Sequence, residues 1–119
     1  MQISVSYLSS HYSNEKTIMM LESTSADYIH VDLMDGGFVE SRNFTIDNVL
    51  KLLKNHEKPL DIHLMTFDPL IYINDLAVLK PEYITFHLEA TKDIVKTIEL
   101  IKRNNIKVGI SIKRATNIL

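Results

Sequence analysis

Residues 28–38, with the sequence Y-I-H-V-D-L-M-D-G-G-F, decide the fold. Apolar and polar side chains alternate here with the two-residue period of a β-strand. His30, Asp32 and Met34 share one face of this strand, and the aliphatic residues between them share the other. Polar groups in such an apolar neighbourhood are costly unless water or a partner satisfies them. The polar face therefore either meets water or holds a ligand.

Four more segments of the chain alternate in the same way. Together with the first they cover roughly residues 2–8, 28–34, 60–65, 82–88 and 107–113. Helical spacing of apolar residues occupies the stretches between them: residues 14–23, residues 46–55, a helix beginning at Pro69, and a last helix capped by Thr91. Strands that alternate with helices indicate a parallel sheet built from right-handed crossovers.

Each predicted strand has one apolar face and one partly polar face. A sheet covered by helices on both sides is apolar on both faces, which these strands are not. In a (β/α)8 barrel, helices cover only the outside, and the site lies at the C-terminal ends of the strands. We therefore predict an α/β fold of the (β/α)8 TIM-barrel type, here about the first five strands and four helices, with the polar face inside.

Composition narrows the class of protein. A chain of 119 residues that is 45% apolar and 24% charged is one globular domain. A net charge of −2, with both signs spread along the chain, gives no reason to expect nucleic acid or a membrane as partner. The absence of cysteine excludes disulfides and thiolate sites. Without a signal-peptide pattern or a spanning apolar run, we expect a cytoplasmic protein.

The polar face carries a candidate metal site. His30 and Asp32 are two residues apart on one strand, so their side chains project the same way, about 6–7 Å apart. His63 lies on the next strand, which a parallel neighbour places at about 4.8 Å. Two imidazoles and a carboxylate form a ligand set for a first-row divalent metal. The alternative is that each histidine is a hydrogen-bonded interior residue.

Other side chains of the same face surround this group. Met34 and Met65 follow the polar residues along their strands, either as core filling or as a dry cover over the site. His87 and Glu89 face the same interior and are expected to be outer partners of the ligands. Asp61 lies at the N-terminal end of its strand, further from the site, and we expect it to have a structural role.

Six blocks of the chain resemble one known family. They are S-Y-L-S-S (6–10), A-D-Y-I-H-V-D-L-M-D-G-G-F-V (26–39), K-P-L-D-I-H-L-M (58–65), D-P-L-I-Y-I (68–73), Y-I-T-F-H-L-E-A (83–90) and I-K-V-G-I-S-I-K (106–113). These blocks are similar to those of the ribulose-phosphate 3-epimerase family of metal-dependent (β/α)8 barrels. The resemblance covers about the first half of that family. It implies a single domain over residues 1–119, the N-terminal half of a ribulose-phosphate-binding barrel, which we expect to be truncated.

The resemblance also implies roles for individual residues. A divalent cation (zinc, iron, manganese or cobalt) would be held by His30, Asp32 and His63, with a further Asp from a later strand. Asp32 would be the catalytic acid and base. The residues implied for substrate binding are Ser6, Met34, His63 and Met65.

The implied activity is isomerisation of a small sugar phosphate. D-ribulose 5-phosphate would be epimerised at C3 to D-xylulose 5-phosphate, through an enediolate, in the pentose phosphate pathway. Two alternatives stay open: an allulose-6-phosphate 3-epimerase, or an inactive half-barrel that binds a metal or a sugar phosphate. Five strands leave two open sheet edges, so we expect a homo-oligomer or pairing with a second half-barrel.

Overall fold

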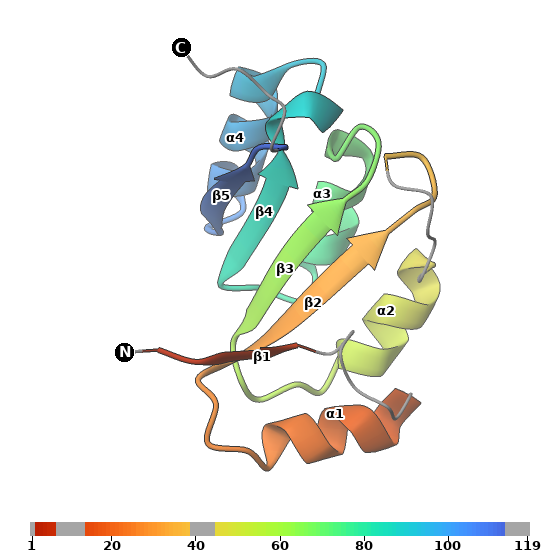
Figure 1. The fold of residues 1–119 in the computed structure, drawn as a ribbon, viewed down its shortest axis with the longest axis vertical. Helices are drawn as coiled ribbons and strands as arrows, with labels where there is room; N and C mark the ends of the chain where they lie inside the picture. Colours follow the sequence, from red (N-terminus) through yellow and green to blue (C-terminus); the bar gives the residue numbers. More distant parts are fainter. Residues whose placement is uncertain (1, 7–13, 39–44, 114–119) are drawn as a thin grey trace.

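The computed structural model describes residues 2–6, 14–38 and 45–113. Five parallel strands form one sheet in the order β1-β2-β3-β4-β5 (Figure 1). The strands are β1 (Ser4–Ser6), β2 (Tyr28–Met34), β3 (Leu60–Met65), β4 (Tyr83–His87) and β5 (Lys107–Ser111). The helices are α1 (Asn14–Glu22), α2 (Ile46–Leu53), α3 (Leu70–Ala77), α4 (Ile94–Arg103) and the short 3-10 helix η1 (Leu88–Ala90).

The predicted strands are confirmed, with differences at their ends. Strands 28–34 and 60–65 match β2 and β3 residue for residue. β4 ends at His87, one residue before the prediction, because the chain turns there into η1. β1 and β5 are shorter than predicted, and residues 7–8 of the first prediction lie outside the described residues.

The four α-helices contain eight to ten residues each. In the described part of the chain, none is long and apolar enough to cross a membrane. The predicted cap of α4, Thr91, is wrong: Asp93 is the N-cap, and its Oδ1 accepts a hydrogen bond of 3.0 Å from the backbone N–H of Lys96. The Thr91 hydroxyl lies instead 2.8 Å from Oγ1 of the buried Thr97.

All four α-helices cover the same side of the sheet (Figure 1). The core lies between them and the strands, where alternate strand residues are buried against the helices. The largest fully buried side chains are Phe86, Ile29, Leu53, Leu60, Ile62, Leu64, Ile73, Leu76, Ile84 and Ile101. Strands in sequential order with one helical layer are typical of a (β/α) barrel and differ from a doubly wound sheet, in which the order reverses. The predicted fold class is confirmed.

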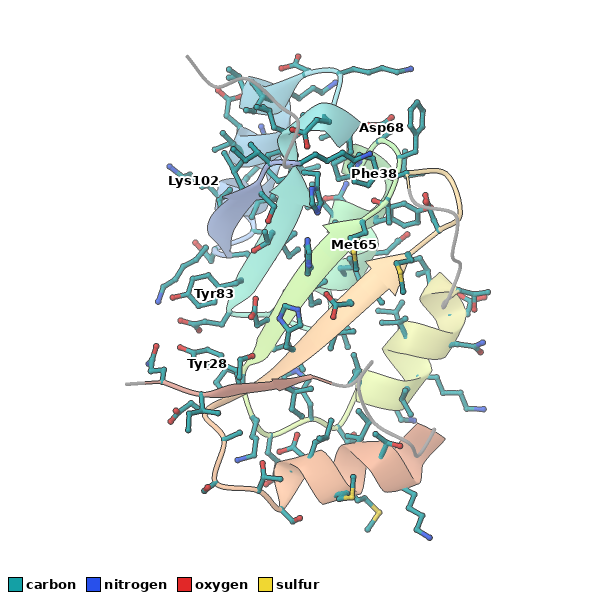
Figure 2. The ribbon with its side chains drawn as sticks, viewed as in Figure 1. Tyr28, Phe38, Met65, Asp68, Tyr83 and Lys102 are labelled. Carbon is teal, nitrogen blue, oxygen red and sulfur yellow. The ribbon has the colours of Figure 1, made fainter. Side chains whose placement is uncertain are left out.

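The opposite side of the sheet carries the residues that alternate with the core. On β2 and β3 these residues are half-buried, whereas their neighbours on the helical side are buried. Tyr28 and Tyr83 lie at the N-terminal end of this face, with ring centroids 6.0 Å apart, and Met65 lies toward its C-terminal end (Figure 2). The histidine and aspartate side chains of β2 and β3 lie between these two ends of the face.

Candidate metal centre

Register brings the candidate residues together. β2 and β3 pair so that Asp32 is level with His63, and His30 is level with Asp61. Because side chains alternate along a strand, all four point to the polar face. The prediction that His63 lies beside the His30–Asp32 pair is confirmed by this pairing.

The oxygen Oδ1 of Asp32 lies at the centre of the group. It is 2.9 Å from Nε2 of His30 and 3.0 Å from Nδ1 of His63. The three ligand atoms all lie within 4.8 Å of one another, and no other such group occurs among the described residues. The side chains are 26%, 16% and 21% exposed for His30, Asp32 and His63, so an ion or small molecule could reach them.

The outer nitrogen of each imidazole also has a partner. Nδ1 of His30 lies 2.8 Å from Oδ2 of Asp61, and Nε2 of His63 lies 2.8 Å from Nε2 of His87. His87 thus contacts His63, the position that the prediction of an outer partner requires. The expectation that Asp61 stands away from the site is wrong, because register places it directly beside His30.

Charge distinguishes the two outer partners. The hydrogen bond to Asp61, opposed by burial and reinforced by Asp32, raises the pKa of His30 from 6.5 to about 9. Burial, and then the neighbouring His63, lowers the pKa of His87. His87 is therefore neutral near pH 7, and its Nε2 can accept a hydrogen bond from Nε2–H of His63.

The two methionines predicted to contact substrate lie on the same face. Met34 and Met65 are level with each other, one same-face position beyond Asp32 and His63. Both are half-buried, and Met65 stands near the C-terminal end of β3 (Figure 2). For Ser6 the structure gives the backbone position, which is level with His30 in the pairing of β1 with β2.

A second group of side chains borders His87; of its members, the sequence predicts Glu89 on this face but gives no position for Phe38. The ring centroid of Phe38 lies 4.9 Å from that of His87, and Nζ of Lys113 lies 4.0 Å from the Phe38 centroid. The backbone N–H of Lys113 donates to Oε1 of Glu89 at 2.8 Å, and the same oxygen lies 3.9 Å from Nδ1 of His87. Phe38 lies beyond the end of β2, where no periodicity indicates which way its side chain points, whereas Lys113 ends the alternating segment 107–113 that is predicted as a strand.

Hydrogen bonds to Asp35 link the loop that follows β2 to the loop that follows β3. Its carboxylate accepts hydrogen bonds from the backbone N–H of Gly37 at 2.9 Å, from that of Phe67 at 3.3 Å, and from the Tyr72 hydroxyl at 3.0 Å. A Cβ at Gly37 would stand 3.0 Å from Cβ of Phe67, so the close approach of the loops favours glycine. The D-G-G sequence alone indicates a turn, but not this link between loops.

The sequence matches known proteins along most of its length. The family model described as "Ribulose-phosphate 3 epimerase family" matches residues 2–119. The ribulose-phosphate 3-epimerase of Treponema pallidum is 33% identical over 112 residues, which are 93% of this chain and 51% of that protein. The protein of the same name in Rhodobacter capsulatus is 32% identical over 116 residues, 97% of this chain and 51% of the relative.

A third relative agrees with these two. The ribulose-phosphate 3-epimerase of Escherichia coli (strain K12) is 38% identical over 97 residues, 79% of this chain and 42% of that protein. The chain thus spans about half the length of the curated relatives it matches.

Proposed function

Because the chain belongs to the ribulose-phosphate 3-epimerase family, we propose that its polar face is half of an epimerase site. The substrate of this proposal is D-ribulose 5-phosphate, converted at C3 to D-xylulose 5-phosphate. The observation that carries the proposal is the placing of one Asp32 oxygen within 3.0 Å of nitrogens from both His30 and His63. We assign the reaction to the cytoplasm and to the pentose phosphate pathway.

The side chains fit a divalent first-row cation. His30 Nε2 and His63 Nδ1 lie 2.9 Å and 3.0 Å from Asp32 Oδ1, and two nitrogens with one oxygen are a donor set suited to such an ion. The far nitrogen of each ring is already hydrogen-bonded, as is usual for metal-binding histidines. When bound, the cation would act as a Lewis acid that favours negative charge on the substrate oxygens at C2 and C3.

In this proposal Asp32 moves the proton. Its carboxylate takes the proton from C3, next to the carbonyl at C2, and leaves an enediolate. Epimerisation then requires a proton delivered to the opposite face of C3. We assign that second acid, together with the phosphate-binding loops, to the other half of a complete barrel.

Three kinds of side chain would position the substrate. His63 stands level with Asp32 and would orient the sugar oxygens. Met34 and Met65 would form a dry surface beside C3, which strengthens electrostatic interactions there. Ser6 would contact the substrate from β1.

Exchange of the C3 proton in deuterated water tests the proposal. The chain is incubated with zinc, iron or manganese and D-ribulose 5-phosphate, and C3 is followed by NMR. Deuterium at C3 with formation of D-xylulose 5-phosphate is expected if two half-barrels assemble a complete site, and deuterium without epimerisation is expected from this half alone. Allulose 6-phosphate, offered in parallel, distinguishes the two substrates.

The matched test variant for this exchange is Asp32→Asn, which keeps the size of the side chain but removes both the base and a negatively charged metal ligand. It should abolish deuterium incorporation, whereas Asp75→Asn on the exposed surface of α3 should not. A folded, metal-loaded chain that incorporates no deuterium would contradict the proposed activity and favour the binding module.

A further inference from the structure

We propose that Asp61 is a positioning residue that fixes the tautomer and orientation of His30, so that Nδ1 carries the proton and Nε2 faces the metal. This inference rests on the proposed function, because it takes His30 as a metal ligand. It assigns a function to a carboxylate that lies outside the group of candidate ligands.

The geometry divides the two nitrogens of the His30 ring between two carboxylates. Nδ1 lies 2.8 Å from Oδ2 of Asp61, and Nε2 lies 2.9 Å from Oδ1 of Asp32. An ionised carboxylate only accepts hydrogen bonds, so Nδ1 must donate to Asp61. Nε2 likewise donates to Oδ1 of Asp32, and a cation bound at Nε2 would take the place of that proton while the Nδ1–H keeps its hydrogen bond to Asp61.

Asp61 is held where this function requires it. It is level with His30 in the pairing of β2 and β3, so backbone hydrogen bonds fix the distance between the two side chains. Its carboxylate is 25% exposed, which leaves its charge only partly screened. The Ser4 hydroxyl lies 3.5 Å from the same Oδ2, too far for a strong hydrogen bond.

The contrast with His63 shows what is particular to Asp61. The outer nitrogen of His63 meets His87, whose ring can donate from one nitrogen or accept at the other. A histidine partner therefore does not dictate which nitrogen of His63 carries the proton. A carboxylate does, and its negative charge also makes the ring a more basic ligand.

The first test measures zinc affinity by competition with a chromophoric chelator. Asp61→Ala should bind zinc about 10- to 100-fold more weakly than the unmodified chain, the usual effect of losing such an outer partner. Asp61→Asn should recover part of the loss, because its amide oxygen can accept the same hydrogen bond without the charge. Circular dichroism checks that each variant is folded.

Asp75→Asn is the matched control, because it removes a carboxylate charge from the exposed surface of α3. If Asp61→Ala binds zinc as tightly as the unmodified chain, or if Asp75→Asn weakens zinc binding just as much, the role proposed for Asp61 is overturned. The proposed metal site would remain. An unmodified chain that binds no zinc would overturn both proposals, so the two failures are distinguishable.

A second test needs no Asp61 variant. In the zinc-loaded chain labelled with 15N-histidine, long-range proton–nitrogen NMR spectra report which ring nitrogen is protonated, and His30→Gln assigns the signals. A slowly exchanging proton on Nδ1 of His30, with Nε2 bound to zinc, is the expected result. A proton on Nε2 would overturn the proposal even if the Asp61 variants fail to fold.

Discussion

Asp35 is the side chain whose charge state matters most to the loops beside the candidate site. Burial alone would raise the pKa of its carboxyl, but hydrogen bonds from the Gly37 N–H, the Tyr72 hydroxyl and the N–H groups of Phe67 and Phe38 outweigh it and lower the pKa below 3.8. The pKa of Asp35 is lower in the folded chain than in the unfolded chain. The ionised carboxylate therefore stabilises the fold above pH 3.8, and this stabilisation is lost as the pH falls through the folded pKa.

Asp35→Asn should therefore lower the free energy of unfolding at neutral pH by about 1–2 kcal/mol, because charge-assisted hydrogen bonds are replaced by weaker ones. The deficit should shrink as the pH is lowered from 3.8, since the unmodified carboxyl then becomes protonated. Urea unfolding of both proteins at several pH values measures this, with Asp75→Asn as the exposed control. A deficit that stays constant into acid would contradict the charge-based explanation.

The contrast between Asp32 and Asp61 shows how far single residues can be predicted from the sequence. Alternation gives the face on which each side chain lies, and it correctly puts His30, Asp32 and His63 on one face. It does not give the register, which decides that Asp61 stands beside His30. Once Asp32 is known to be level with His63, the position of Asp61 follows from the two-residue period.

The sequence predicts the bounds of β2 and β3 residue for residue. β2 and β3 have neighbours on either side, and their alternation of apolar and polar residues has no exception. β1 and β5 are the outer strands of the described sheet and are shorter than their alternating sequences. At α4, the T-K-D sequence offers two capping residues, and only the observed bond to Lys96 identifies Asp93.

The contact between β4 and β5 depends on a glycine. Gly109 is level with Thr85, and a Cβ at Gly109 would collide with Oγ1 of Thr85 and stand 3.0 Å from its Cβ. Gly109→Ala should therefore destabilise the chain by about 1–3 kcal/mol, the usual cost of overpacking. The double variant with Thr85→Ala should recover part of this loss, because the colliding hydroxyl is gone.

Thermal unfolding of the two single variants and the double variant measures this coupling. Additive losses would contradict the proposed collision. Gly37→Ala tests a different close contact for comparison. Its added Cβ would meet Phe67 in the neighbouring loop, whereas the Cβ of Gly109→Ala would meet a residue of the adjacent strand.

Among the residues that the structure describes, exposed aliphatic side chains lie at the outer strand β5. Beside the buried core residues of β4, Ile110 of β5 is 46% exposed, and Ile112 beyond the strand is 42% exposed. Exposed aliphatic side chains beside an outer strand favour association. The predicted homo-oligomer would place this area at the contact between two copies of the chain.

Ile110→Lys should weaken this association, because a charged side chain would have to be desolvated at the contact. Sedimentation over a range of concentrations should show a larger monomer fraction for Ile110→Lys than for the unmodified chain. Ile71→Lys is the matched control, since Ile71 is 61% exposed on α3, away from β5. An equal effect of both substitutions, or none of either, would contradict the proposed contact.

The most direct test of the proposed metal centre is a crystal structure of the zinc-loaded chain, with anomalous data collected at the zinc absorption edge. The expected result is one anomalous peak within about 2.0–2.2 Å of Nε2 of His30, a carboxylate oxygen of Asp32 and Nδ1 of His63. A zinc peak elsewhere, with these side chains still hydrogen-bonded to one another, would contradict the assignment of the site.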